Sequence, residues 1–141
     1  MDWKTVLSQA GYRLSEPRKR VHQILESTDQ PLTPLQIYQE FEKGGYLPGL
    51  ISVYRTLELL TQLGIAVRVY TSDGNVGYLA ASLGHHHHIL CQNCHRAVEF
   101  DGSEDLGAWF SQVEKQTGFV VNDHLLQLYG ICPDCREKQG T

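Results

Sequence analysis

The chain has 141 residues, enough for one domain of ordinary size or for two small ones. Its formal net charge is −4, and the excess lies after residue 83, where four Lys and Arg residues stand against eight Asp and Glu residues. The chain as a whole is therefore not a basic nucleic-acid binder, although a local basic patch would suffice to meet phosphates. It has no apolar leader and no apolar run long enough to span a membrane, so we expect a cytoplasmic protein.

The first half contains four segments with the apolar spacing of helices, at residues 6–10, 21–25, 33–44 and 50–63. Ser15-Glu16-Pro17 and Thr33-Pro34 are helix start signals, and Gly64 ends the last segment. Two β-rich runs follow, at 65–71 and 76–80, and the Asp73-Gly74 pair between them predicts a hairpin. Helices followed by a hairpin are the order of a winged helix-turn-helix domain, in which the last helix enters the major groove.

This order predicts which side chains meet DNA. Tyr54 and Arg55 point away from the apolar stripe of the fourth helix, so they would contact base edges or phosphates, while basic residues near the second helix would anchor the DNA backbone. The candidate DNA contacts are Arg13, Arg18, Lys19, Arg20, Ser52, Tyr54 and Arg55. The alternative is that the basic cluster is an ordinary solvated helix face, that Tyr54 merely covers the small core, and that Arg55 pairs with Glu58.

The second half contains two CxxC pairs that use every cysteine in the chain, Cys91 with Cys94 and Cys132 with Cys135. Two such pairs predict one tetrahedral zinc site, and four protein ligands leave no open position for a substrate, so this zinc would be structural. Two disulfides in a secreted protein, or redox-active CxxC motifs, are the competing interpretations.

Four consecutive histidines, His85 to His88, run directly into the strand that carries Cys91. If Cys91 lies opposite Cys94, then His88 faces Ala97 and His86 faces Glu99, so that His86, His88 and Glu99 share one side of the ribbon and His85 and His87 the other. Imidazole and carboxylate ligands suit Zn, Fe(II), Mn or Co, so the ligand types alone do not select a metal. An expression tag or a solvated polar stretch would be the alternative reading of the run.

A helix and a further strand complete the second half. The helix is predicted to have Ser103 as N-cap, Glu104 and Asp105 in its first turn, a buried stripe of Leu106, Phe110 and Val113, and Gly118 as its stop. The acidic pair would complement the helix dipole or reach a metal. The β-rich run 124–131 leads into the second cysteine pair, which makes His124 the candidate third ligand beside His85 and His87.

Together these residues resemble the ferric uptake regulator family along nearly the whole chain. The resemblance rests on Ala10-Gly11 before Pro17-Arg18, the run from Gly49 to Leu57, the run from His85 to Cys94 with Glu99-Phe100, and the run from His124 to Cys135. It implies an α+β protein, with a winged-helix DNA-binding domain at 1–83 including the hinge and a small α/β dimerisation domain at 84–141. It further implies a homodimeric repressor that controls metal-ion homeostasis, with structural zinc on the four cysteines and a second divalent metal, Zn, Fe(II) or Mn.

The resemblance also assigns the histidines. His86, His88 and Glu99 match ligands of a sensing site at the hinge, and His85, His87 and His124 match a further site in the dimerisation domain. The pattern fails where family members take extra ligands: a histidine near Pro31-Leu32, a carboxylate near Leu79 in iron sensors, a cysteine near Ala81 in zinc sensors, and a helix glutamate near Leu106-Gly107. The hinge site would therefore sense more weakly, recruit another ligand from the N-terminal half, or leave regulation to the second histidine site.

Three functions follow as hypotheses. A metal-dependent repressor on a palindromic duplex accounts for all the motifs, a zinc-buffering or metal-delivery protein would use the histidine run without DNA, and a hydrolytic enzyme would need an open metal position and a base. No HExxH motif occurs and all four cysteines are committed to one site, so we expect neither an enzyme nor a small-molecule substrate.

Overall fold

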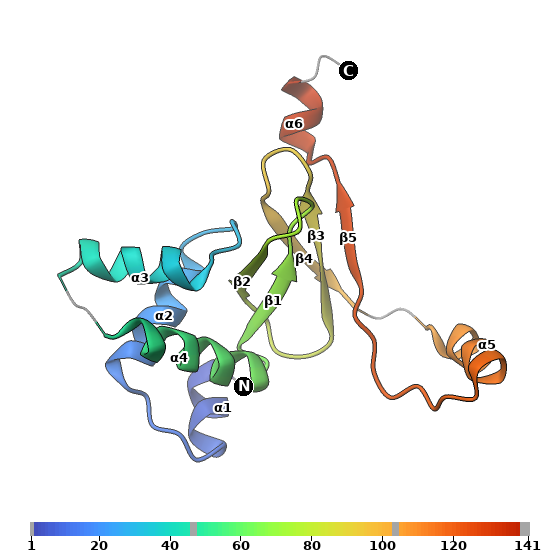
Figure 1. Cartoon of the computed structure of the whole chain (residues 1–141), viewed down its shortest axis with the longest axis horizontal. Coiled ribbons are helices and arrows are strands. Elements are labelled where there is room, and N and C mark those ends of the chain that lie inside the picture. Colours follow the sequence, from blue (N-terminus) through green and yellow to red (C-terminus); the bar gives the residue numbers. More distant parts are fainter. Residues whose placement is uncertain (1, 46–47, 103–104, 139–141) are drawn as a thin grey trace.

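The computed structural model describes residues 2–45, 48–102 and 105–138, and within these ranges it has an α+β fold (Figure 1). The helices are α1 (Trp3–Gln9), α2 (Glu16–Glu26), α3 (Pro34–Lys43), α4 (Leu50–Gln62), α5 (Gly107–Thr117) and α6 (Pro133–Lys138). The strands are β1 (Ala66–Tyr70), β2 (Val76–Ala80), β3 (His86–Cys91), β4 (Ala97–Asp101) and β5 (Gln127–Gly130). No helix among the described residues is long and apolar enough to cross a membrane.

The four N-terminal helices form where the sequence predicted them. The side chain of Ser15 accepts a hydrogen bond from the Arg18 N–H, and Thr33 forms a capping box with Gln36, so both caps satisfy otherwise open amides. The helices share one apolar core with the start of β1 and with β2, made of Leu7, Val21, Leu25, Ile37, Phe41, Val53, Leu57, Leu60, Ile65, Ala66 and Tyr78.

The wing is the antiparallel hairpin β1–β2, whose turn has Gly74 at a φ of 87°, as the Asp-Gly signal predicted. It is attached to the helices by a bridge between Leu32 and Tyr78. Gly77 is required beside this bridge, because a Cβ atom there would lie 2.6 Å from the Cβ of Pro31. The helices and the wing are therefore one packed unit.

The second sheet has the strand order β4-β3-β5, with β3 antiparallel to β4 and parallel to β5. The expected register of β3 against β4 is wrong by two residues, since His88 lies opposite Glu99 and His86 opposite Asp101. The cysteine turn is wider than expected: the Cys91 N–H donates to the Arg96 carbonyl at 2.9 Å, so the turn extends through His95, which has a φ of 69°. A shift of two residues keeps the same side chains on each face.

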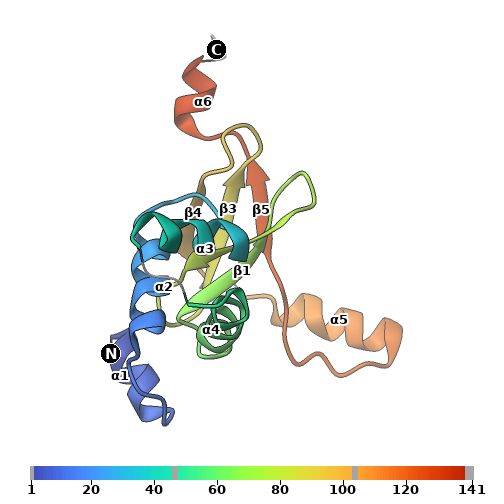
Figure 2. The same ribbon diagram turned by 60° about the vertical axis from the view of Figure 1, so that its left-hand side comes forward.

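Three expectations for the segment after β4 are also wrong. Ser103 and Glu104 lie outside the described residues, Asp105 precedes the helix, and α5 begins at Gly107 without a side-chain cap. None of α5 is buried, and the predicted stripe is only half-buried, because α5 stands apart from both sheets (Figures 1 and 2). Its end at Gly118, with a φ of 77°, is as predicted. His124 was expected within a strand, but β5 begins only at Gln127.

The wing packs against the second sheet through a small apolar cluster. Val69 of β1 and Leu79 of β2 lie against Leu90 of β3 and Ala97 of β4, and all four are buried. The Ala97 N–H also donates to the main-chain oxygen of Asp29, in the loop after α2, at 2.8 Å. These contacts join the two halves of the chain without a metal ion.

Candidate metal centres and DNA-binding surface

The four cysteine sulfurs gather at the end of the second sheet, where the β3–β4 turn meets the start of α6. All four Sγ atoms lie within 4.8 Å of one another, and the Sγ atoms of Cys91 and Cys135, like those of Cys94 and Cys132, are 3.8 Å apart. A disulfide needs about 2.05 Å, so these thiols are not paired in that way. Zinc–sulfur bonds of about 2.3 Å place tetrahedral sulfurs about 3.8 Å apart, so the four residues fit zinc.

The main chain around the cysteines stabilises thiolates. The N–H groups of Cys94, Cys132 and Asn93 donate to the Sγ atom of Cys91 at 3.4–3.5 Å and lower the pKa of this thiol to about 5. A hydrogen bond with Asn93 would lower the pKa of Cys135, but hydrogen bonds with the sulfurs of the other three cysteines, together with desolvation, raise it to about 11. A zinc ion would replace these protons and hold all four sulfurs as thiolates.

A second cluster consists of His85, His87 and His124, whose ligand nitrogens also lie within 4.8 Å of one another. The ring centroids of His85 and His87 are 4.6 Å apart, and that of His124 is 5.1 Å and 5.4 Å from them. The structure therefore brings together the three histidines that the sequence grouped. They line a cavity of about 160 Å³ together with residues 67–69 of the wing and residues 123–127. Neutral imidazoles in this arrangement suit Zn and other divalent transition metals.

The other face of the histidine run carries His86, His88 and Glu99. The Glu99 carboxylate lies 3.9 Å from Nδ1 of His86 and 3.6 Å from Nε2 of His88. The three do not form as tight a group as the other histidines. Burial lowers the pKa of His88. Burial alone would raise the pKa of Glu99, but hydrogen bonding to Ser82, whose N–H donates at 3.0 Å, and the neighbouring imidazoles lower it.

This second face opens on a cavity of about 280 Å³ between the two halves of the chain. Its walls include residues 79–82 and the end of α2 with the loop that follows it, besides His88 and Glu99. Leu79, at the position where iron sensors would have a carboxylate, is 5% exposed and belongs to the apolar cluster. The wall of this cavity is therefore apolar at the place where a ligand was missing from the sequence.

The predicted DNA-binding residues divide into two groups. Arg18, Ser52 and Arg55 line one cavity of about 200 Å³ between the start of α2 and α4, and the Arg18 guanidinium donates to the main-chain oxygen of Arg13 at 2.8 Å. Tyr54 is 53% exposed on α4. All of α4 lies within the described residues, and no ion pair joins its Arg55 to its Glu58. Polar and aromatic groups thus gather around the exposed face of α4.

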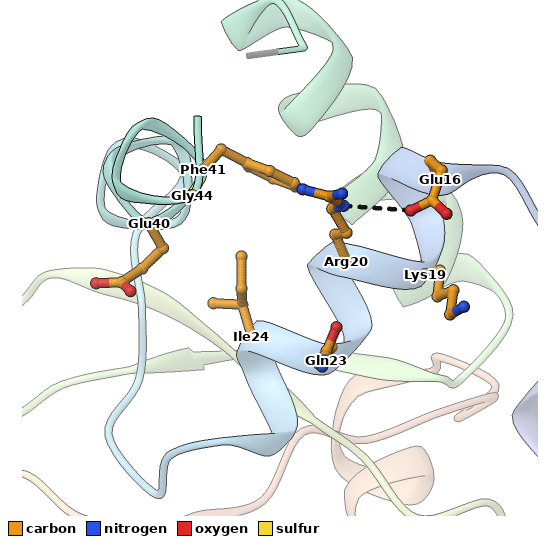
Figure 3. A pocket seen from close by; sticks show the side chains of 8 residues that line it. All are labelled: Glu16, Lys19, Arg20, Gln23, Ile24, Glu40, Phe41 and Gly44. Carbon is orange, nitrogen blue, oxygen red and sulfur yellow. Dashed lines mark hydrogen bonds and ion pairs between the residues drawn. The ribbon is translucent and has the colours of Figure 1, made fainter. Parts of the chain in front are cut away.

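Lys19 and Arg20 line a different cavity from the one that Arg18 lines. They line a groove of about 380 Å³ between α2 and α3, where Arg20 pairs with Glu16 at 3.2 Å and extends toward the ring of Phe41 (Figure 3). Glu40 lies on the opposite wall, so the groove carries both signs of charge. The basic cluster of the sequence is therefore not one continuous patch.

Comparison with known proteins shows to which family the chain belongs. The model of the ferric uptake regulator family matches residues 9–129. The chain belongs to the ferric uptake regulator family. Curated relatives bear the names ferric and zinc uptake regulation protein, and the chain is a metal-responsive, DNA-binding regulator of transcription and not an enzyme.

Family members named for zinc and members named for iron are similar to the chain to about the same degree. The zinc uptake regulation protein of Mycobacterium tuberculosis is 32% identical over 92% of this chain and 99% of its own length. The structure of the ferric uptake regulator of Francisella tularensis with iron has a TM-score of 0.62 at 28% identity, covering 89% of this chain and 96% of that one. A zinc uptake regulator complexed with zinc and DNA shares the fold with a TM-score of 0.80 at 18% identity, over 98% and 93%. Family membership therefore does not select the metal.

Sequence reasoning missed several residues around the candidate metal sites. Gln127 and Tyr129 of β5 bind the main chain of Tyr70 in the wing, and Ser82 binds Glu99. Nothing in the spacing of a single Gln or Ser predicts such contacts, since they depend on how the wing lies on the second sheet.

Proposed function

We propose that the chain is a metal-dependent repressor, which binds a palindromic DNA duplex as a homodimer through α4 and the basic residues beside it. The observation that carries this proposal is the convergence of Arg18, Ser52 and Arg55 on one cavity next to the exposed Tyr54, in a member of a regulator family. In a winged helix-turn-helix the residues of the last helix contact base edges, and cations beside it contact phosphates.

The homodimer is supported by apolar surface that one copy leaves exposed. Trp109, Phe119, Val120 and Leu125 are each 59–77% exposed, and all lie in or after α5, which stands apart from the rest of the molecule (Figure 2). Large apolar side chains gathered in this way indicate a protein–protein contact. We therefore assign dimerisation to residues 84–141 and DNA binding with the hinge to residues 1–83. Sedimentation of the zinc-loaded protein should give twice the mass of one chain, whereas a single chain at micromolar concentration would contradict this assignment.

We assign structural zinc to Cys91, Cys94, Cys132 and Cys135, because the sulfur distances fit a tetrahedral ion. A regulatory divalent metal, Zn, Fe(II) or Mn, would be held by the histidines. Glu99 would add a carboxylate to His86 and His88, and its lowered pKa keeps it ionised at neutral pH. A regulator of transcription of this kind would work in the bacterial cytoplasm.

Selection from a pool of random duplexes tests the function. Zinc-loaded protein is titrated with Zn, Mn, Fe(II) or Co at fixed salt, and the bound sequences are identified. We expect one metal to switch on selective binding, which falls about tenfold or more in Arg55→Ala and Tyr54→Ala, since a good base contact contributes about 1–3 kcal/mol.

Gln62→Ala serves as the matched control, because Gln62 is exposed at the far end of α4. It should bind DNA as the wild type does. Unchanged binding by Arg55→Ala and Tyr54→Ala would reject the assignment of these residues. Absence of duplex binding under every metal would reject the repressor and favour a metal-buffering protein.

A further inference from the structure

The side chain of Gln127 binds the main chain of Tyr70 as a neighbouring strand would. Its Oε1 atom accepts a hydrogen bond from the Tyr70 N–H at 3.1 Å, and its Nε2 atom donates to the Tyr70 oxygen. The Tyr129 hydroxyl donates to the same oxygen at 2.6 Å and accepts from Nε2 of Gln127 at 2.7 Å. The last residue of wing strand β1 is thereby tied to β5 of the other half.

Gln127 is joined to the three-histidine cluster by a short stretch of chain. His124 lies three positions before it, and residues 123–127 form one wall of the cavity that holds the cluster. The opposite walls are the histidine run and residues 67–69 of β1. One segment thus carries a potential metal ligand at one end and the partner of the wing at the other.

The segment that joins α5 to Gln127 is irregular. Residues 119–126, all of them described, form neither helix nor strand, and Gln127 is the first residue of β5, opposite His88. His124 lies against the rings of His85 and His87 and, at 5.5 Å, Phe110. Irregular backbone that leads into the first residue of a strand is a region where local opening costs little free energy.

We propose that Gln127 is the positioning residue through which a divalent cation at His85, His87 and His124 controls DNA binding. A cation that joins His124 to the two histidines of the β3 side holds residues 123–127 where Gln127 meets Tyr70. It therefore binds this arrangement better than one in which His124 has moved away, and it shifts the population accordingly. The proposal rests on the proposed DNA-binding function and assigns its regulation to this cluster in place of the hinge.

Two neighbouring histidines offer a matched pair of variants. His85 and His86 are consecutive, but His85 belongs to the three-histidine cluster and His86 contacts Glu99 on the other face. Protein with zinc on its cysteines is titrated with Co²⁺, and hydrogen exchange of the Tyr70 amide is followed without DNA. We expect Co²⁺ to slow this exchange in the wild type and in His86→Ala, and to have no effect in His85→Ala. Slowing that survives in His85→Ala and disappears in His86→Ala would overturn the proposal.

A second variant separates positioning from metal binding. Gln127→Ala keeps all three histidines, so we expect it still to bind Co²⁺ by calorimetry, with an affinity lower by no more than the coupling, but to lose the Co²⁺-induced gain in DNA affinity, which should be about tenfold in the wild type. An equal gain in both proteins would overturn the proposal. If no form binds DNA, the proposed function fails, while the exchange of Tyr70 still decides whether the cluster controls the wing.

Discussion

His22 shows how a single buried side chain makes the N-terminal half sensitive to acid. It lies buried on α2, with its ring stacked 4.0 Å from that of Trp3 and its Nε2 atom 3.6 Å from Glu26. Burial lowers its pKa below the ordinary value of 6.5, although Glu26 works in the opposite direction. The unfolded chain therefore binds the proton more readily than the folded chain.

This difference predicts the sign of a pH effect. The stability that neutral His22 contributes is present above pH 6.5 and is lost as the pH falls through the range between the unfolded and folded pKa values. In His22→Phe, which keeps a ring beside Trp3, the free energy of unfolding should fall less between pH 7 and about pH 5. The difference from the wild type is at most about 1.4 kcal/mol per pH unit. Denaturant titrations at several pH values measure it, and parallel curves for the two proteins would contradict the prediction.

At Gly77, the space that a side chain would need is already filled by Pro31 and Leu32. Its added Cβ atom would meet Pro31 at 2.6 Å and the Leu32 nitrogen at 3.3 Å, both in the loop that pairs with β2. Gly77→Ala should therefore destabilise the protein by about 1–3 kcal/mol, as overpacking does. Gly44→Ala is the control, because its φ of −84° suits alanine and the nearest atom to a Cβ there would be at an ordinary contact distance of 3.6 Å. Equal thermal midpoints for the two variants would show that the loop yields freely.

At the scale of the element, the zinc cluster and the strands it joins depend on one another. Cys91 ends β3, while Cys132 and Cys135 lie just after β5 and in α6, so a bound ion would fix the parallel pair at one end. Arg96 adds an ion pair to Asp134 at 3.0 Å. β5 is only four residues long and half exposed, so it has little apolar burial of its own to hold it.

Removal of zinc should therefore release β5 selectively. In protein treated with a strong chelator, backbone amides of β5 should exchange much faster, because metal binding and folding are coupled in such sites. Amides of α2 and α4 should keep their protection, since their core contains none of the four cysteines. Hydrogen exchange with mass spectrometry distinguishes these regions, and uniform exchange of both halves would show that they unfold together.

The elements differ in how well the sequence predicted them, and the reason is where their determinants lie. The caps at Ser15 and Thr33 and the Asp73-Gly74 turn act within a few residues, so those helices and the hairpin were predicted correctly. The register of β3 and β4 depended on the width of the cysteine turn, which the CxxC spacing does not fix. The apolar stripe of α5 was real in the sequence, but the described parts of the same chain cover it only in part, as where His124 lies against Phe110.

In the candidate site, too, the features set by local spacing were predictable from the sequence, and those set by packing were not. Alternation along a strand was enough to separate His85 and His87 from His86 and His88, and the faces survived the error in register. The separation of Arg20 from Arg18, and the contact of Gln127 with Tyr70, depend on packing between elements far apart in the chain. No local pattern could reveal them.

At the scale of the whole molecule, the two halves are joined by an apolar cluster at the hinge. Leu79 is central to it, since it lies with Val69 against Leu90 and Ala97. Leu79→Ala should lower the free energy of unfolding by about 2–3 kcal/mol, at the lower end for buried leucines because the cluster is small. Val76→Ala, at an exposed site in the same strand, should change it by less than about 0.5 kcal/mol. Similar losses in both variants would mean that the halves are not held together at Leu79.

The position of the cysteines links the two candidate metal clusters. The parallel strand that leads to the second CxxC pair begins at Gln127, just after His124. Zinc on the thiolates would hold that strand at its far end and would so help to place His124 beside the other two histidines. An oxidant that converts the thiols to disulfides would release the strand, so the redox state of the cell would act on the histidine cluster without changing a single imidazole.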